Sequence, residues 1–316
     1  MNTASRHRYA CILLDDAFKL SVCTPEHEDV LRGIIELLIP GKHVGSLILR
    51  DKEQHGLVIS DKNATFDLYC TDKDSGEQFI VEMQMEAQAS FRDRALSYAT
   101  YPIQKQLATK LQLAREGKLP DRMDYSLHPV YVISMVNFQI PHEDPSILEE
   151  GLISRYCICN RQTGEPMTDA LHFVYLELGR LRWGADEGDK CESLLEQFAF
   201  AARYMHTQSE RPASFTDPFL LKLYEAAELA AMTREQRTKI DRIMTTQLDI
   251  NGWINHAYDK GVEEGHAEGH AEGLEQGHSN AMREVAEKLL QSQQDINYVS
   301  SITGLSVEAL HSLMPQ

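Results

Sequence analysis

The sequence lacks paired cysteines and long hydrophobic runs. Its six cysteines include no CxxC pair, so a zinc site built on such pairs is not indicated, and several lie in apolar runs where a thiol packs as a small hydrophobe. No apolar run approaches the roughly 20 residues of a membrane-spanning helix. The apolar run at residues 10–14 is too short for the core of a signal peptide. We therefore expect a cytoplasmic protein without membrane association.

Positive charge is also scarce. The chain has 31 Lys and Arg against 48 Asp and Glu, a net charge of −17. This balance counts against a surface devoted as a whole to nucleic acid, because phosphate binding depends on clustered Lys and Arg. A local basic groove is still compatible with it. Residues 86–118 hold six basic side chains against three acids, the basic ones being Arg92, Arg94, Lys105, Lys110, Arg115 and Lys118.

Two short apolar runs, TFDLYC at residues 65–70 and QFIVEMQ at residues 78–84, have the alternation of β-strands. The segment between them is rich in Asp, Ser and Gly, which favour turns, so the pair predicts a β-hairpin. Each run contains a carboxylate, Asp67 in the first and Glu82 in the second. A buried carboxylate is costly unless it is paired, hydrogen-bonded or bound to a metal. The hairpin is therefore the first candidate for a functional site.

Hairpin pairing can place Asp67 beside Glu82, and Gln84 shares the face of Glu82 because side chains alternate along a strand. Two carboxylates that converge in this way can hold Mg²⁺ or Mn²⁺, with water and substrate phosphate as further ligands. The structural alternative is a pair of edge carboxylates without a metal. On spacing alone both interpretations stay open.

The hairpin and the helix expected after it, with Arg94, Tyr98 and TYPIQKQ, resemble the PD-(D/E)XK nuclease superfamily in its recombination-promoting nuclease or putative transposase branch. The segments LLDDAFKL, DKEQHGL, HPVYVISMVNF and ITGLS, together with a glycine repeat near the C-terminus, extend the resemblance over most of the chain. Gln84 departs from the superfamily pattern, which has Lys at this position. A neutral amide can orient a water or a phosphate, but it cannot supply charge or act as a base.

The resemblance implies an α/β fold with a restriction-endonuclease-like αβββαβ core and a mixed sheet. It implies that Asp67 and Glu82 bind the metal with the Met83 carbonyl, and that Gln84 positions the attacking water. Glu53, upstream of the hairpin, is a further acidic ligand in this interpretation and a turn residue in the alternative one. We expect the nucleic acid to contact the helix after the hairpin, through Arg92, Arg94, Tyr98 and Lys105. The alternative for Arg94 and Tyr98, four residues apart on one helical face, is a structural pair.

The 316 residues are enough for one large domain with an appendage. We assign the nuclease-like core to residues 1–180, an α-helical subdomain to 181–257, a glycine-repeat acidic linker or helix to 258–280 and a small helical tail module to 281–316. Within the core, residues 90–117 predict a helix interrupted near Pro102, and residues 130–136 predict a strand. Asp15 and Asp16 are most simply capping residues of a helix that begins at Ala17.

The C-terminal region favours self-association. Glycine recurs every fourth residue from 261 to 277, and such a face permits close helix contact, so a homo-oligomer is expected through this repeat and the helices after it. His266 and His270 have the i,i+4 spacing of metal ligands, but without the Glu of an HExxH motif they are not assigned to a site. The tail has the rhythm of a helix-turn-helix. Residues 306–316 contain no Lys or Arg, so protein contact is favoured over DNA reading.

The favoured hypothesis is a Mg²⁺-dependent DNA endonuclease that hydrolyses phosphodiester bonds and is linked to recombination or mobile elements. The alternative is a catalytically inactive protein of the same fold that acts as an oligomerising DNA-binding or regulatory module. RNA as the substrate stays open as well.

Overall fold

The computed structural model describes residues 7–50, 53–54, 64–65, 67–87, 90–118, 125–246, 280–288, 290–292 and 295–313. The chain forms two compact units, Met1–Thr245 and Thr246–Gln316. The first unit contains both the sheet and the helices up to residue 245. Among the described residues, no helix has the length and apolar character needed to cross a membrane.

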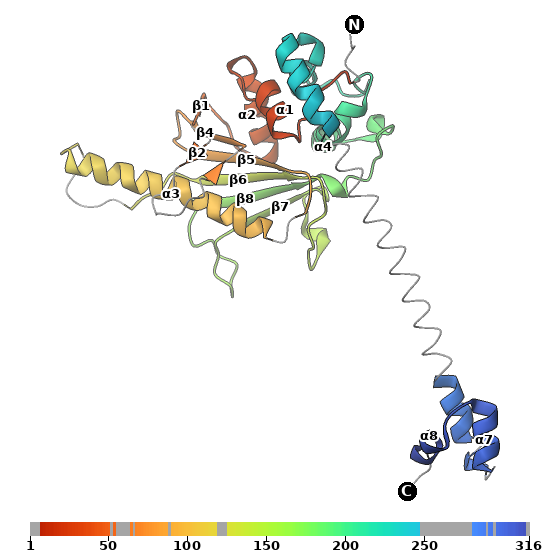
Figure 1. The fold of residues 1–316 in the computed structure, drawn as a ribbon. Coiled ribbons are helices and arrows are strands. Elements are labelled where there is room, and N and C mark those ends of the chain that lie inside the picture. Colours follow the sequence, from red (N-terminus) through yellow and green to blue (C-terminus); the bar gives the residue numbers. More distant parts are fainter. Residues whose placement is uncertain are drawn as a thin grey trace. The chain divides into compact units, whose positions relative to one another are not determined.

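The first unit is built on a mixed sheet of six strands (Figure 1). The strands, in spatial order, are β1 (Leu47–Leu49), β4 (Leu68–Asp72), β5 (Gln78–Gln84), β6 (Val130–Val136), β8 (Leu171–Glu177) and β7 (Ile153–Cys157). β5, β6 and β8 are parallel to one another, and the three other strands join antiparallel. The expected α/β class and mixed sheet are therefore confirmed. Two further strands, β2 (Glu53–Gln54) and β3 (Ala64–Thr65), form a separate two-stranded sheet.

Helices cover both faces of the sheet (Figure 1). α3 (Phe91–Arg115) connects β5 to the parallel strand β6 and lies on one face, where its Ala95 and Ala99 pack with Ile80 and Val132. The other face carries α1 (Asp15–Ser21), α2 (Glu28–Leu38) and α4 (Leu194–Tyr204). The buried residues of α2 recur at helical spacing, which explains why this segment presents one apolar side: Val30, Leu31, Ile34, Ile35 and Leu38.

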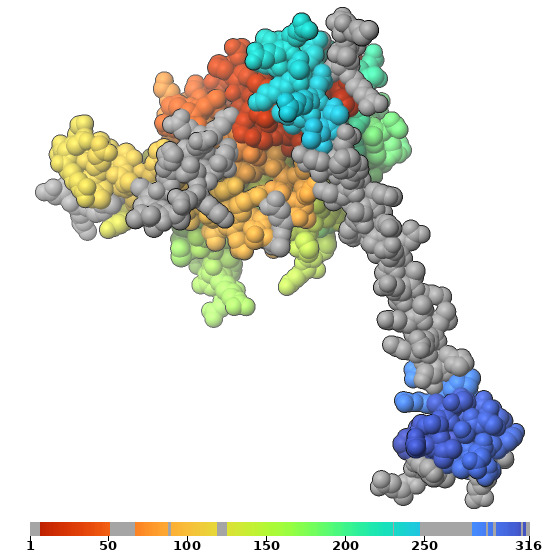
Figure 2. All heavy atoms as spheres, in the orientation of Figure 1, coloured from red at the N-terminus to blue at the C-terminus, as the bar shows by residue number. Residues whose placement is uncertain are grey.

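α3 is continuous through Pro102, so the predicted interruption is wrong. Proline removes a helical hydrogen bond and ordinarily kinks or breaks a helix. Here Pro102 is buried together with Ala95, Ala99 and Gln106 on the side of α3 that packs on the sheet. Tertiary packing therefore outweighs the local preference. The C-terminal part of α3 extends past the strands, where Leu111 is exposed (Figures 1 and 2).

The remaining helices of the first unit complete its apolar core. α4 begins after Ser193, whose hydroxyl accepts from the Glu196 amide, and α5 (Pro218–Ala226) begins after Asp217, which caps it in the same way. Residues 234–246 are also helical. Among the described residues, short 3₁₀ segments lie at Pro25–His27, Pro145–Ile147, Leu178–Arg180, Gly188–Lys190, Met205–Thr207 and Leu229–Ala231.

The second unit has a small core of its own. Residues 280–288 are helical and are followed by α7 (Ile296–Thr303) and α8 (Val307–Ser312). Ala286, Val299 and Leu310 pack together at its centre. Gly304 ends α7 with a φ of +71°, a left-handed conformation that glycine adopts without strain. The helix-turn-helix rhythm predicted for the tail matches these elements, whereas the glycine repeat lies outside the described residues.

Candidate active site

Asp67 and Glu82 lie side by side on the hairpin. β4 pairs with β5 so that Leu68 faces Val81, and the preceding residue, Asp67, therefore stands opposite Glu82. The Asp67 amide donates to Glu82 Oε1 at 3.2 Å, and the Met83 amide donates to Asp67 Oδ2 at 2.8 Å. Each carboxylate is thus held by the backbone of the neighbouring strand. The predicted adjacency of the two carboxylates is confirmed.

This pair is electrostatically strained. Burial, and then the Asp67 charge, raise the pKa of Glu82 well above its ordinary value, and only 8% of the Glu82 residue is exposed. Burial also raises the pKa of Asp67, although the Met83 amide opposes this by lowering it. The Arg94 charge lowers the pKa of both carboxyl groups. Two like charges so close together, one of them buried, are stable only if a cation or a proton compensates them.

Gln84, Arg94 and Tyr98 form a second group at the same end of the sheet. Arg94 donates a hydrogen bond from Nη2 to Gln84 Oε1, and the Gln84 Nε2 amide donates to the Glu86 carbonyl at 2.8 Å. The Arg94 guanidinium lies 5.9 Å from the centroid of the Tyr98 ring. The neutral amide at the position of the superfamily lysine is therefore paired directly with a cation from α3.

Asp15 and Lys19 lie close enough to this site for their charges to act on it, which was not predicted from the sequence. α1 begins at Asp15, and its N-cap is Leu14, so the prediction that the two aspartates cap a helix starting at Ala17 is wrong. Asp15 forms an ion pair with Lys19 one turn later. The Asp15 charge raises the pKa of both Asp67 and Glu82, and the Lys19 charge lowers that of Asp67. The available signal was the Asp-to-Lys spacing of four residues within LLDDAFKL.

The other predicted residues are more dispersed. Glu53 lies in β2, in the separate two-stranded sheet, and its side chain is outside the description. Lys105 lies eleven positions after Arg94 on α3, with its ammonium 5.5 Å from the Tyr101 ring centroid. Arg92 points toward β7 instead, where its guanidinium lies 5.6 Å from the Tyr156 ring centroid. The structure thus brings together Asp67, Glu82, Gln84, Arg94 and Tyr98. Arg92 and Lys105 lie outside this group.

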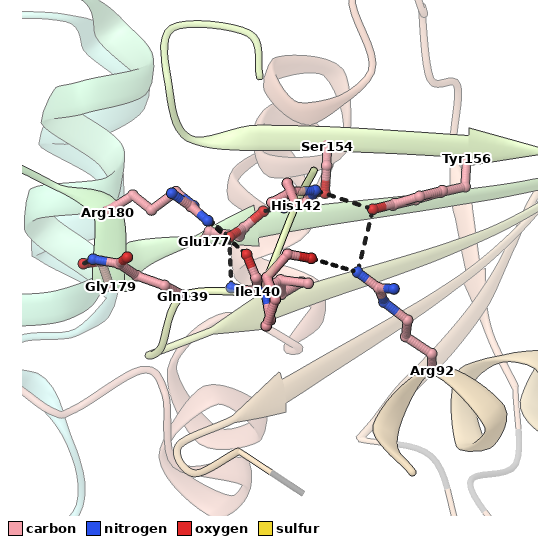
Figure 3. Close-up of polar contacts among 10 residues, drawn as sticks. Arg92, Gln139, Ile140, His142, Ser154, Tyr156, Glu177, Gly179 and Arg180 are labelled. Atoms are coloured by element: carbon pink, nitrogen blue, oxygen red, sulfur yellow. Dashed lines mark hydrogen bonds and ion pairs between the residues drawn. The ribbon is translucent and has the colours of Figure 1, made fainter. Parts of the chain in front are cut away.

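A second buried carboxylate, Glu177, lies at the end of β8 and organises the polar network next to Arg92 (Figure 3). It is fully buried, and it accepts from the Ile140 amide at 2.8 Å and from Arg180 Nε at 2.6 Å. His142 Nε2 lies 2.5 Å from its other oxygen, and Tyr156 Oη lies 3.4 Å from His142 Nδ1. The network fixes the loop after β6, whose Pro141 carbonyl accepts from Arg92 at 3.4 Å. The signal in the sequence was a lone acid in the apolar run HFVYLEL.

The donor set at Asp67 and Glu82 fits a hard divalent cation. Such ions prefer oxygen ligands and often use one or two carboxylates with water and phosphate. A cation here would compensate the two neighbouring carboxylates, of which Asp67 raises the pKa of Glu82 by its charge. No cluster of three or more His, Cys, Asp or Glu side chains with metal-binding geometry occurs among the described residues. The described site therefore offers two carboxylates and leaves the remaining ligands to backbone, water and substrate.

A mixed sheet with an α-helical crossover and a carboxylate pair on its hairpin is consistent with a nuclease-like fold. The sequence matches the PD-(D/E)XK nuclease family transposases over residues 12–257. The chain belongs to this family. No curated protein and no solved structure matches it. Membership indicates a nuclease linked to mobile elements.

Proposed function

We propose that this protein is a divalent-metal-dependent endonuclease that hydrolyses phosphodiester bonds in DNA. The observation that carries the proposal is the Asp67–Glu82 pair, held side by side on the hairpin by backbone amides of the opposite strand. The family indicates a nuclease, and the carboxylate pair supplies oxygen ligands suited to Mg²⁺ or Mn²⁺. When bound, such an ion supplies Lewis-acid polarisation of the phosphate and activation of water.

In this proposal each residue of the site has its own role. Asp67 and Glu82 would hold the ion, together with the Met83 carbonyl and with Glu53 from the segment before the hairpin. Arg94 would bind the phosphate and supply the positive charge that Gln84 cannot. Gln84, oriented by its bond to Arg94, would position the attacking water. Tyr98 and Arg92 would contact the DNA strand on either side of the bond that is cleaved.

The test is nicking of supercoiled plasmid with Mg²⁺ or Mn²⁺. Asp67→Asn and Glu82→Gln keep the shape of the side chains and remove one charged ligand each, so both are expected to abolish nicking. Asp74→Asn is the matched control, since Asp74 is an exposed carboxylate in the turn of the same hairpin. Full activity in either active-site variant would contradict the proposal.

The alternative proposal is a catalytically inactive protein of this fold that binds DNA and associates with itself through the C-terminal segment. The favouring observation is that the Gln84 amide is bonded at both ends within the protein, to Arg94 and to the Glu86 carbonyl. Tight DNA binding without metal-dependent nicking would support this alternative. Sedimentation of the full chain and of a chain ending at residue 245 would measure the contribution of the C-terminal segment to self-association.

A further inference from the structure

A polar pocket of about 360 Å³ opens beside α3, away from the carboxylate pair. Side chains alternate along a strand, so Thr71 shares a face of β4 with Asp67, and Gln78 shares a face of β5 with Glu82. Thr71 and Gln78 line this pocket. The face under α3 is thus polar at both ends and apolar between them, where Ile80 packs against the helix.

Three cationic side chains line the pocket, and no Asp or Glu does so in the part of the chain that the structure describes. Arg50 Nε donates to Thr71 Oγ1 at 3.0 Å, which orients the guanidinium. The Lys105 ammonium lies 5.9 Å from the Tyr69 ring centroid, and the Lys110 ammonium donates to the Ser126 carbonyl at 2.6 Å. In a chain with a net charge of −17, a pocket lined by three cationic side chains favours binding of an anion.

The position of the pocket relative to the active site matches a nucleic-acid strand. Gln78 precedes Glu82 by four residues on β5, a separation of about 13 Å at the usual rise of a strand. Along α3, Arg94 and Lys105 are separated by about 16 Å at the rise of an α-helix. With one phosphate per strand for roughly every 3.4 Å of duplex axis, these lengths correspond to about four or five nucleotides.

We infer that the Arg50–Lys105–Lys110 pocket binds a backbone phosphate of the nucleic-acid substrate, about four nucleotides from the bond placed at Asp67 and Glu82. This inference rests on the proposed function for the distance between the bound phosphate and the cleaved bond, but binding of the phosphate does not require cleavage. Arg50, Lys105 and Thr109 are all exposed at the pocket. A continuous strand can therefore pass over it, and a free phosphate is the competing source of the same chemistry.

The decisive variant is Thr109→Glu, which places a carboxylate inside the pocket. Gln104→Glu is its matched control, because Gln104 is equally an exposed residue of α3 but does not line the pocket. Binding of a fluorescent 20-base-pair duplex is measured by anisotropy in Ca²⁺, at several salt concentrations. Thr109→Glu is expected to weaken binding about fivefold more than Gln104→Glu does, the scale of one close like-charge contact at a solvated surface.

Two charge-neutralising variants test the phosphate contact itself. Arg50→Gln and Lys105→Gln are each expected to reduce the slope of log affinity against log salt by about 1, as loss of one phosphate contact does. Inorganic phosphate is titrated by calorimetry in parallel. Binding of inorganic phosphate that Thr109→Glu abolishes, with duplex affinity unchanged, would overturn the inference in favour of a small-anion site.

The outcomes separate this inference from the proposed function. Loss of duplex affinity in Thr109→Glu, without nicking by the parent protein, would support phosphate binding in the pocket and contradict the proposed nuclease activity. Nicking by the parent protein, with equal duplex affinity in Thr109→Glu and Gln104→Glu, would support the proposed nuclease activity and overturn the inference that the pocket binds phosphate. Absence of duplex binding by the parent protein would overturn the inference.

Discussion

The paired carboxylates should make the metal-free protein less stable than its own amide variant. Replacing Glu82 with Gln retains the side-chain shape and an oxygen that accepts from the Asp67 amide, but removes one of two neighbouring charges. Directly opposite side chains on an antiparallel pair have Cβ atoms about 5 Å apart. At that separation and an effective dielectric of about 20, two unit charges repel by about 3 kcal/mol. Burial and the Asp67 charge raise the pKa of Glu82, so this repulsion is an upper bound and the expected gain in the free energy of unfolding is about 1–3 kcal/mol.

The assay is thermal unfolding at pH 8 in EDTA and in Mg²⁺. For a domain of this size, each kcal/mol shifts Tm by about 2–4 °C, so Glu82→Gln is expected to unfold several degrees above the parent in EDTA. Mg²⁺ at 100 times its Kd adds about 2.7 kcal/mol to the parent, and this gain should be much smaller in the variant. The advantage of the variant over the parent should therefore shrink by about 2 kcal/mol or more when the metal is added.

Two controls make the result specific. Asp74→Asn removes a carboxylate from the exposed turn of the same hairpin and should leave Tm unchanged in both buffers. Glu82→Ala removes the acceptor of the Asp67 amide and should destabilise the protein. A lower Tm of Glu82→Gln in EDTA, together with an undiminished response to Mg²⁺, would refute the charge-repulsion argument.

Three further predictions concern other described residues. Burial lowers the pKa of His206 to about 4, so between about pH 6.5 and 4 the unfolded chain binds a proton that the folded chain does not. The free energy of unfolding should therefore fall by up to about 3 kcal/mol as the pH is lowered through this window. The check is the pH profile of Tm, which should be flatter in His206→Leu. Glu177→Ala leaves Arg180 without its buried counter-charge and the Ile140 amide without its acceptor, and it should cost about 3–5 kcal/mol in chemical unfolding, whereas Glu187→Ala, which breaks an exposed ion pair, should cost far less; equal costs would contradict the role assigned to burial. Asp15→Asn should raise the Mg²⁺ concentration needed for nicking by about 10- to 100-fold, as outer-shell changes do, while Asp16→Asn, next to it but paired with Lys239, should leave it unchanged.

Local pattern was enough to predict the hairpin and the neighbouring carboxylates. β6 spans Val130–Val136, the range predicted from its apolar run. The alternation of β4 and β5 fixes which residues can face one another, so the pairing of Asp67 with Glu82 follows from spacing and turn length. These features are determined within a few residues of sequence.

Features that depend on packing between distant segments could not be predicted in this way. The spacing of Asp15 and Lys19 within LLDDAFKL indicates their ion pair, but not that the Asp15 charge acts on the carboxylates of the hairpin, which depends on where α1 packs. Pro102 stays helical because the sheet covers α3. Glu177 shows the limit of the signal itself: like Glu82 it is a buried acid in an apolar strand, yet its partners are Arg180 and His142.

The parallel centre of the sheet also has a consequence for heat inactivation. β6 is buried along its whole length, and β5, which carries Glu82 and Gln84, pairs with it through all seven residues. Amide hydrogens in such doubly covered strands exchange through opening of the whole domain rather than through local fluctuation. The Glu82 carboxylate on β5 should therefore keep its position until the domain unfolds cooperatively, and under the proposed function the loss of nicking activity on heating should coincide with the main unfolding transition.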